Sequence, residues 1–266
     1  MSSEQVGSAD ERIGSADDRL ELLRWGGRGP RVLLVHGSLV DGPRTWAAQR
    51  PLGEHRRVEV VQRRGFGAGP PADGDDFERD AEDLLALLAD GPAHLVGHSY
   101  GAIGCLAAAI RAPHLVTSLT LVEPTCVGIS DDPGLLAAVE VIKGWWKDRP
   151  ADLAEFLTGY SRLLGIRVPR FDRDDREMAR AVELLRECRA PWDTDLPCER
   201  VREAGVPTLV VSGGHSPPLD AVSAVAAART GGKHVVLTGA GHAVQFLGPA
   251  FNEVLEEMLS TTGVGC

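Results

Sequence analysis

Ser99 lies at the centre of the sequence Gly-His-Ser-Tyr-Gly, between a short apolar run over 93–96 and a segment rich in helix-forming residues over 102–110. The apolar run is typical of a buried strand, so we predict a tight turn between a strand and a helix. Gly97 and Gly101 remove the side chains that would collide with the neighbouring backbone in such a turn. The turn pushes the Ser99 hydroxyl out near the positive end of the following helix. We therefore predict that Ser99 is a catalytic nucleophile.

The rest of the chain alternates between strands and helices. Apolar runs predict strands over 20–25, 31–36, 58–62, 93–96, 119–123, 206–212 and 234–238, and helical spacing predicts helices over 77–88, 102–110 and 252–259. This alternation indicates an α/β fold with a mostly parallel central sheet and helices on both faces. Chemistry gathers beyond the carboxyl ends of strands in such sheets. The residues at or just after such ends are His36, Ser99, Glu123 and His242.

The interval between Glu123 and Val206 breaks this alternation, because it contains no convincing strand. Helical stretches are predicted in it near 135–147, 151–164 and 174–188. We interpret the interval as a helical cap over 126–195, inserted into a core formed by 19–125 and 196–266. Residues 1–18 are predicted to be a flexible N-terminal tail.

The predicted cap carries aromatic side chains at helical spacing. They favour an apolar pocket between the cap and the strand ends, where an acyl group or a ring would bind. The candidate pocket residues are Leu39 from the core and Trp145, Trp146, Phe156, Tyr160 and Leu164 from the cap.

Composition and charge exclude several classes of partner. The 266-residue chain has a formal net charge of −10 and a pI near 5.3, which disfavours nucleic acid and anionic membrane surfaces. No apolar stretch approaches the roughly 20 residues of a membrane span, and residues 1–18 lack the apolar segment of a secretory signal. The five cysteines favour reduced thiols. We expect a cytoplasmic protein that acts on a small molecule; its oligomeric state is left open.

With these elements in order, the chain resembles the α/β-hydrolase superfamily from Leu20 to Leu259. The motifs that carry the resemblance are His36-Gly37, Arg64-Gly65-Phe66-Gly67, the turn at Ser99, and Gly239-Ala240-Gly241-His242. The resemblance implies an α/β-hydrolase fold with a serine nucleophile and says little about the substrate.

A serine hydroxyl is a poor nucleophile at neutral pH and needs a base beside it. The resemblance implies that His242 is this base, and the chain order agrees because the histidine comes last in this fold. The developing oxyanion also needs fixed donors, each worth roughly 3 kcal/mol. The resemblance implies the backbone N–H groups of Tyr100 and Ser38, with that of Leu39 as the alternative to Ser38.

The third catalytic residue is where the sequence departs from the common pattern. Much of the superfamily has an aspartate soon after the strand over 206–212, and here Ser216 occupies that position. Glu123 ends the preceding strand, as the acid does in some haloalkane dehalogenases of the superfamily. A carboxylate buried there needs a partner, and His242 would supply it. Asp220, or a dyad assisted by Ser216, stays open as an alternative.

These residues together predict a serine hydrolase that cleaves an ester, lactone or thioester of a small metabolite through an acyl-enzyme on Ser99. The sequence has no His-Glu-x-x-His or paired-cysteine metal site and no phosphate-binding glycine loop, so neither a metal nor a cofactor is predicted. The same fold also supports acyl transfer, carbon–carbon bond hydrolysis, and cofactor-free oxidation or lyase chemistry. A non-catalytic binding protein is a further alternative, and its support is the missing aspartate near Ser216.

Overall fold

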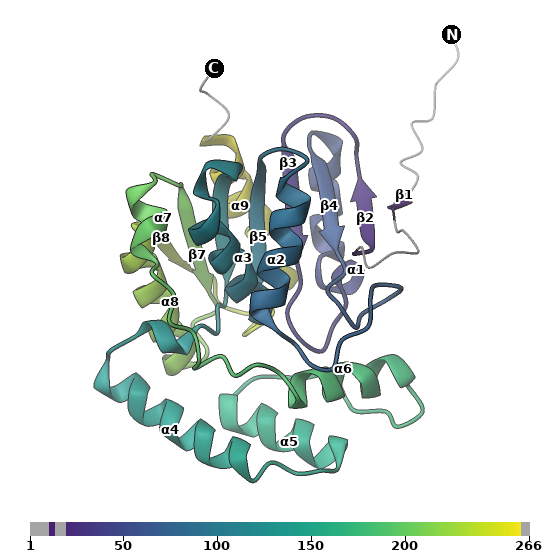
Figure 1. Cartoon of the computed structure of the whole chain (residues 1–266), viewed down its shortest axis with the longest axis vertical. Helices are drawn as coiled ribbons and strands as arrows, with labels where there is room; N and C mark the ends of the chain where they lie inside the picture. Colours follow the sequence, from purple (N-terminus) through teal and green to yellow (C-terminus); the bar gives the residue numbers. More distant parts are fainter. Residues whose placement is uncertain (1–10, 14–19, 262–266) are drawn as a thin grey trace.

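The computed structural model describes residues 11–13 and 20–261, which form one eight-stranded sheet with surrounding helices (Figure 1). The strands are β1 (Glu11–Ile13), β2 (Leu22–Trp25), β3 (Arg31–Val35), β4 (Arg57–Val61), β5 (Ala93–His98), β6 (Val116–Val122), β7 (Thr208–Ser212) and β8 (Lys233–Val236). They lie in the order β1-β2-β4-β3-β5-β6-β7-β8. β2 pairs antiparallel with β1 and with β4, and every pairing from β4 to β8 is parallel.

The α-helices of these described segments are α1 (Gly42–Thr45), α2 (Phe77–Leu88), α3 (Tyr100–Arg111), α4 (Pro133–Lys147), α5 (Leu153–Leu164), α6 (Arg176–Arg186), α7 (Glu199–Glu203), α8 (Pro217–Thr230) and α9 (Pro249–Thr261). The 3-10 helices are η1 (Ala47–Glu54), η2 (Pro113–Leu115), η3 (Val127–Ile129) and η4 (Val244–Leu247). Aspartates begin three of these helices: the side chains of Asp76, Asp132 and Asp152 accept first-turn N–H groups of α2, α4 and α5. Those N–H groups have no partner within the helix, so the caps determine where the helices begin.

The sheet is buried on both faces. Leu33 and Val35 of β3 pack into the apolar core beneath α2, α3 and α8, whereas Val32 and Leu34 pack against η1 and α9. Successive side chains of a strand point to opposite faces, so one short strand serves both cores. Figure 1 shows α2 and α3 across the front of the sheet and α9 behind it. The predicted α/β fold, with a mostly parallel sheet covered on both faces, is confirmed.

Helices α4, α5 and α6, here called the cap, lie together at one end of the sheet (Figure 1). An aromatic cluster holds them: the ring of Trp146 lies 5.6 Å from those of Phe156 and Trp192, centroid to centroid. Leu157 and Val182 complete this buried cluster from α5 and α6. The helices occur where the sequence predicts them, while the cap boundaries at 126 and 195 stay a prediction.

One part of the predicted N-terminal tail is ordered. Glu11–Ile13 form β1 and pair with β2, so the tail prediction over 1–18 is wrong for these three residues. The physical reason is the free edge of β2, whose backbone N–H and C=O groups accept a neighbouring strand. A run of three residues is too short to show a strand pattern in the sequence. The predicted turn at Asp17-Asp18 lies outside the described residues.

Candidate active site

Ser99 occupies the turn between β5 and α3 with φ 52° and ψ −120°. This conformation is sparsely populated by residues other than glycine, and the surrounding backbone enforces it. A Cβ atom at Gly97 would lie 2.6 Å from the Cα atom of Ala102, and one at Gly101 would lie 2.2 Å from the carbonyl oxygen of His36. Both glycines are therefore required for this close packing. The turn leaves Ser99 at the N-terminus of α3, where the helix dipole favours negative charge.

Ser99, His242 and Glu123 form one continuous hydrogen-bonded array. The Nε2 atom of His242 lies 2.8 Å from the Oγ atom of Ser99, and its Nδ1 atom lies 2.9 Å from the Oε2 atom of Glu123. Gly239 and Gly241, both with positive φ, lie in the loop that leads from β8 to His242. Burial and the neighbouring His215 lower the pKa of His242, which keeps the ring neutral and able to accept a proton.

Glu123 follows β6 directly and its side chain is fully buried. The N–H group of Gly213 donates a hydrogen bond to its Oε1 atom. Burial raises the pKa of Glu123, while this bond from Gly213 and the neighbouring histidines oppose the rise. The two alternatives to Glu123 have other partners. Asp220 accepts from the N–H group of Gly214, and the Ser216 hydroxyl donates to the Leu164 carbonyl. The structure thus brings Glu123, and neither alternative, to His242.

The two predicted oxyanion donors belong to residues that border one cavity with Ser99. Each is also tied to Asp75: the Ser38 hydroxyl donates to its carboxylate, and the Tyr100 hydroxyl donates to its backbone carbonyl over 2.9 Å. The buried guanidinium of Arg63 lies 2.9 Å from the Asp75 carboxylate. Asp75, paired with Arg63, therefore holds both Ser38 and Tyr100 in place. The sequence reading missed Asp75, which lies in a polar loop without a recognisable motif.

Backbone strain in the described residues is concentrated at this site. The non-glycine residues there with positive φ are Leu39, Ser99 and Glu123, at 72°, 52° and 50°. Each such residue costs of order 1–3 kcal/mol and persists only where the surroundings enforce it. Leu39 follows the candidate oxyanion residue Ser38, so all three strained positions belong to the loops that present the array.

A cavity of about 470 Å³ extends from Ser99 beneath the cap. Its wall is mainly apolar and includes Leu135, Ala138, Val139, Ile142, Trp146, Tyr160 and Leu163, with Arg162 as a charged side chain. Neither Leu39 nor Trp145 is on this wall. The Trp145 ring instead packs 5.5 Å from that of Phe156, and Leu39 joins the apolar cluster of the cap. Adjacent residues of a helix point about 100° apart, and here Trp146 faces the cavity while the Trp145 ring packs beside Phe156.

Three further histidines lie around the array. The Nε2 atom of His98 lies 2.9 Å from the carbonyl oxygen of His242, and the Nε2 atom of His36 accepts from the backbone N–H of Arg63. These two contacts support the loops around the site. His215, to which the sequence analysis gives no role, borders the cavity, and its Nδ1 atom lies 3.8 Å from Glu123. Its place in the loop after β7, where an acid was expected, was the available signal.

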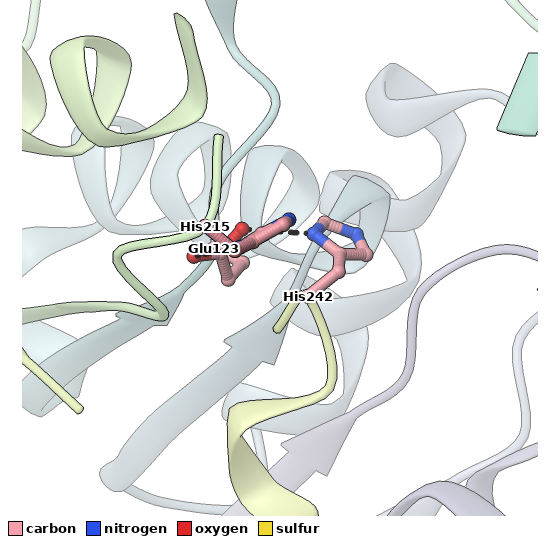
Figure 2. A group of neighbouring side chains, drawn as sticks. All are labelled: Glu123, His215 and His242. Atoms are coloured by element: carbon pink, nitrogen blue, oxygen red, sulfur yellow. Dashed lines mark hydrogen bonds and ion pairs between the residues drawn. The ribbon is translucent and has the colours of Figure 1, made fainter. Parts of the chain in front are cut away.

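Glu123, His215 and His242 are also residue types that bind transition metals. Figure 2 shows them converging from three segments, the end of β6 and the loops after β7 and β8. One ligand atom from each lies within 4.8 Å of the other two. The sequence predicts no metal, and the wide separation of these residues along the chain hides the group from any motif.

Comparisons with known proteins agree with the fold. Residues 32–254 match the model of the alpha/beta hydrolase family. The chain belongs to the α/β-hydrolase family. Within the described residues, no helix combines the length and apolar character that crossing a membrane requires.

The individual relatives differ in their activities. Over 122 residues the chain is 29% identical to the pimeloyl-(acyl-carrier protein) methyl ester esterase of Aeromonas salmonicida, covering 45% of this chain and 47%, about half, of that protein. It is 31% identical to the dihydrolipoyllysine-residue acetyltransferase component of the acetoin cleaving system of Pseudomonas putida, over 96% of this chain and 71% of that one. A thermophilic esterase from Thermogutta terrifontis superposes with a TM-score of 0.66 at 23% identity, over 95% and 99% of the two chains. That last likeness concerns the fold alone.

Proposed function

We propose that this enzyme is a serine hydrolase that cleaves esters, lactones or thioesters with a modest-sized apolar group. The observation that carries the proposal is the array of Ser99, His242 and Glu123, which opens into a mainly apolar cavity. A neutral imidazole within 2.8 Å of a serine hydroxyl, with a carboxylate on its other nitrogen, is the arrangement that activates serine. The apolar wall favours an acyl or alcohol group of limited polarity.

The reaction proceeds through an acyl-enzyme. The Oγ atom of Ser99 attacks the carbonyl carbon while the Nε2 atom of His242 takes the hydroxyl proton. Backbone N–H groups of Ser38 and Tyr100 stabilise the oxyanion, and Glu123 holds the Nδ1–H group of the imidazolium. His242 then gives its proton to the leaving group. Water, activated by the same histidine, attacks the acyl-enzyme and regenerates the Ser99 hydroxyl.

The experiment is the intact-protein mass after exposure to a fluorophosphonate probe. We expect one adduct on the wild type, mapped to Ser99, and none on Ser99→Ala or His242→Ala. Ser99→Ala also abolishes hydrolysis of p-nitrophenyl esters, because no other hydroxyl replaces the nucleophile. A folded wild type that stays unlabelled, or a labelled Ser99→Ala protein, would contradict the proposal.

Acyl transfer is the second candidate, and the observation that favours it is the likeness to the acetyltransferase component from Pseudomonas putida. Its first half-reaction is identical, and an alcohol or thiol replaces water in the second. Adding a primary alcohol or a thiol during ester turnover distinguishes the two. A transfer product that dominates at millimolar acceptor, with little free acid, would favour a transferase over a hydrolase.

A further inference from the structure

The imidazole of His215 is an unexplained group at the edge of the array. Both of its ring nitrogens are shielded from solvent, and neither has a hydrogen-bond partner among the described residues. The nearby carboxylate of Glu123 lies 3.8 Å from its Nδ1 atom, which is too far for a hydrogen bond. Buried polar atoms are almost always satisfied, so this ring is placed for a ligand that the protein itself does not supply.

We propose that Glu123, His215 and His242 form an inhibitory binding site for Zn²⁺. The donor set is one carboxylate oxygen and two imidazole nitrogens, each atom within 4.8 Å of the others (Figure 2). Two imidazoles and a carboxylate suit zinc, whereas Mg²⁺ prefers oxygen ligands throughout. The cavity that His215 borders gives the ion a route in, and a water molecule completes its coordination.

The geometry requires only a small adjustment. Zinc binds nitrogen and oxygen at about 2.0–2.2 Å, which places tetrahedral ligands about 3.4 Å apart. The 2.9 Å contact between Glu123 and His242 has to open slightly, and His215 has to approach by up to about 1.4 Å. Among the described residues no hydrogen bond holds the His215 ring in place, so this movement breaks none.

Occupation of the site removes the catalytic base, a consequence that rests on the proposed function. The neutral His242 ring carries one proton, on Nδ1 toward Glu123, and its Nε2 lone pair accepts from Ser99. Zinc bound to Nδ1 needs the lone pair of that nitrogen, so the proton moves to Nε2. The ring keeps one proton and stays neutral, but it no longer accepts the proton of Ser99. The serine is then not activated, and Glu123 is no longer available to stabilise an imidazolium.

The first test measures zinc binding without activity. Isothermal titration with ZnCl₂ uses full-length protein that carries no polyhistidine tag and has been stripped with EDTA. We expect one zinc per chain in the wild type and in Ser99→Ala, since Ser99 is not a ligand. Binding in His215→Phe weakens at least about tenfold. Equal affinity in the wild type and His215→Phe would overturn the proposal; should His215→Phe not fold, His215→Gln takes its place.

The second test measures hydrolysis of an activated ester, with each variant compared with its own zinc-free rate. Zinc is expected to inhibit the wild type over the range in which calorimetry detects binding, and EDTA restores the rate. Half-inhibition of the His215 variant needs at least about ten times more zinc, and Mg²⁺ inhibits neither. A wild type that binds zinc and remains fully active would overturn the inhibitory role. Failure of the proposed function is distinct, because probe labelling and hydrolysis would then be absent without zinc.

Discussion

Glu123 combines three properties that follow from its position immediately after β6. It has a positive φ, its side chain has no exposed surface, and it contacts the histidine that faces Ser99. A buried carboxylate is costly unless hydrogen bonds compensate it, and the N–H group of Gly213 and the Nδ1 atom of His242 lie within hydrogen-bond distance of Glu123. The strained backbone conformation turns the side chain out of the strand direction and toward the imidazole. Such strain is tolerated where function requires it.

The assignment of the acid predicts opposite results at two carboxylates. Glu123→Gln is expected to lower kcat/KM for an activated ester by about 10²–10⁴-fold, because the amide no longer stabilises the imidazolium. Asp220 accepts from the N–H group of Gly214 and does not contact His242, so kcat/KM of Asp220→Asn is expected to stay within about threefold of the wild type. Steady-state kinetics on both variants, with circular dichroism as a fold check, measure this. A near-normal Glu123→Gln together with an inactive Asp220→Asn would assign the acid to Asp220.

Helix α3 packs so closely behind the oxyanion segment that its first turn admits only glycine at position 101. Gly101→Ala places a Cβ atom 2.2 Å from the His36 carbonyl oxygen, so we expect destabilisation by about 1–3 kcal/mol and loss of probe labelling. Gly144→Ala is the matched control, because this exposed residue of α4 has no atom near an added Cβ. Gly144→Ala is expected to stabilise the protein by about 0.5–1 kcal/mol. Urea denaturation measures whether the free energy of unfolding falls in Gly101→Ala and rises in Gly144→Ala. A destabilised Gly144→Ala would contradict the expectation that alanine stabilises an exposed helix position.

Strands β5 and β6 are joined by a buried side-chain contact whose stability depends on pH. The Nδ1 atom of His94 lies 2.7 Å from the Oγ atom of Ser118, and burial lowers the pKa of His94 from 6.5 to about 4. Between these values the unfolded chain binds a proton that the folded chain does not. The contribution of His94 is therefore present above pH 6.5 and is lost as the pH falls toward 4.

Replacing His94 should remove part of the acid sensitivity. We expect the loss of unfolding free energy between about pH 7 and about pH 4.5 to be smaller in His94→Gln than in the wild type, by about 2 kcal/mol. Urea denaturation of both proteins at both pH values measures these losses. Subtracting one loss from the other cancels the contribution of groups that titrate equally in the two proteins. An identical loss in the two proteins would show that His94 titrates normally in the fold.

The elements also show how far the sequence determines the site. The turn at Ser99 was predicted from a local pattern, and the roles of His242 and Glu123 from the family resemblance, with all three placed together because strand ends meet at one edge of a parallel sheet. β1 was not predicted, since its pairing depends on the free edge of β2 rather than on its own three residues. The direction of Trp145 and the approach of His215 to Glu123 depend on how a helix is rotated and how a loop folds back. Those are properties of tertiary packing, which local periodicity does not contain.

At the scale of the whole molecule, the cap and the core enclose the cavity jointly. Tyr100 connects the two, because its hydroxyl lies 2.9 Å from the carbonyl oxygen of Asp75 and 2.8 Å from that of Arg189, so its one proton is shared between them. The N–H group of Arg189 in turn donates to the Asp75 carbonyl over 2.7 Å. Tyr100, Asp75 and Arg189 thus hold the segment that follows α6 next to the candidate oxyanion residues. Many of the residues that line the cavity belong to helices α4 and α5, so these two helices mainly determine the volume available to a substrate.

Filling the cavity from α4 should change the preferred chain length of the substrate. Ala138 lies on the cavity wall, and the neighbouring Ala137 is exposed and does not. Ala138→Trp is expected to lower the ratio of kcat/KM for p-nitrophenyl octanoate over that for the acetate by about tenfold or more, because the long acyl chain loses its space. Ala137→Trp leaves the ratio unchanged. An equal change in both variants would place the acyl chain outside this cavity.

β6 and β7 are neighbours in the sheet although the whole cap separates them along the chain. Ser99 and Glu123 precede the cap, and His242 follows it. A polypeptide divided within the cap therefore yields one half that holds the proposed nucleophile and the proposed acid, and another that holds only the proposed base. Neither half contains a complete set. Enzymatic turnover would report the reassembly of the two halves along the β6–β7 seam, which makes this architecture suited to a split-protein complementation reporter.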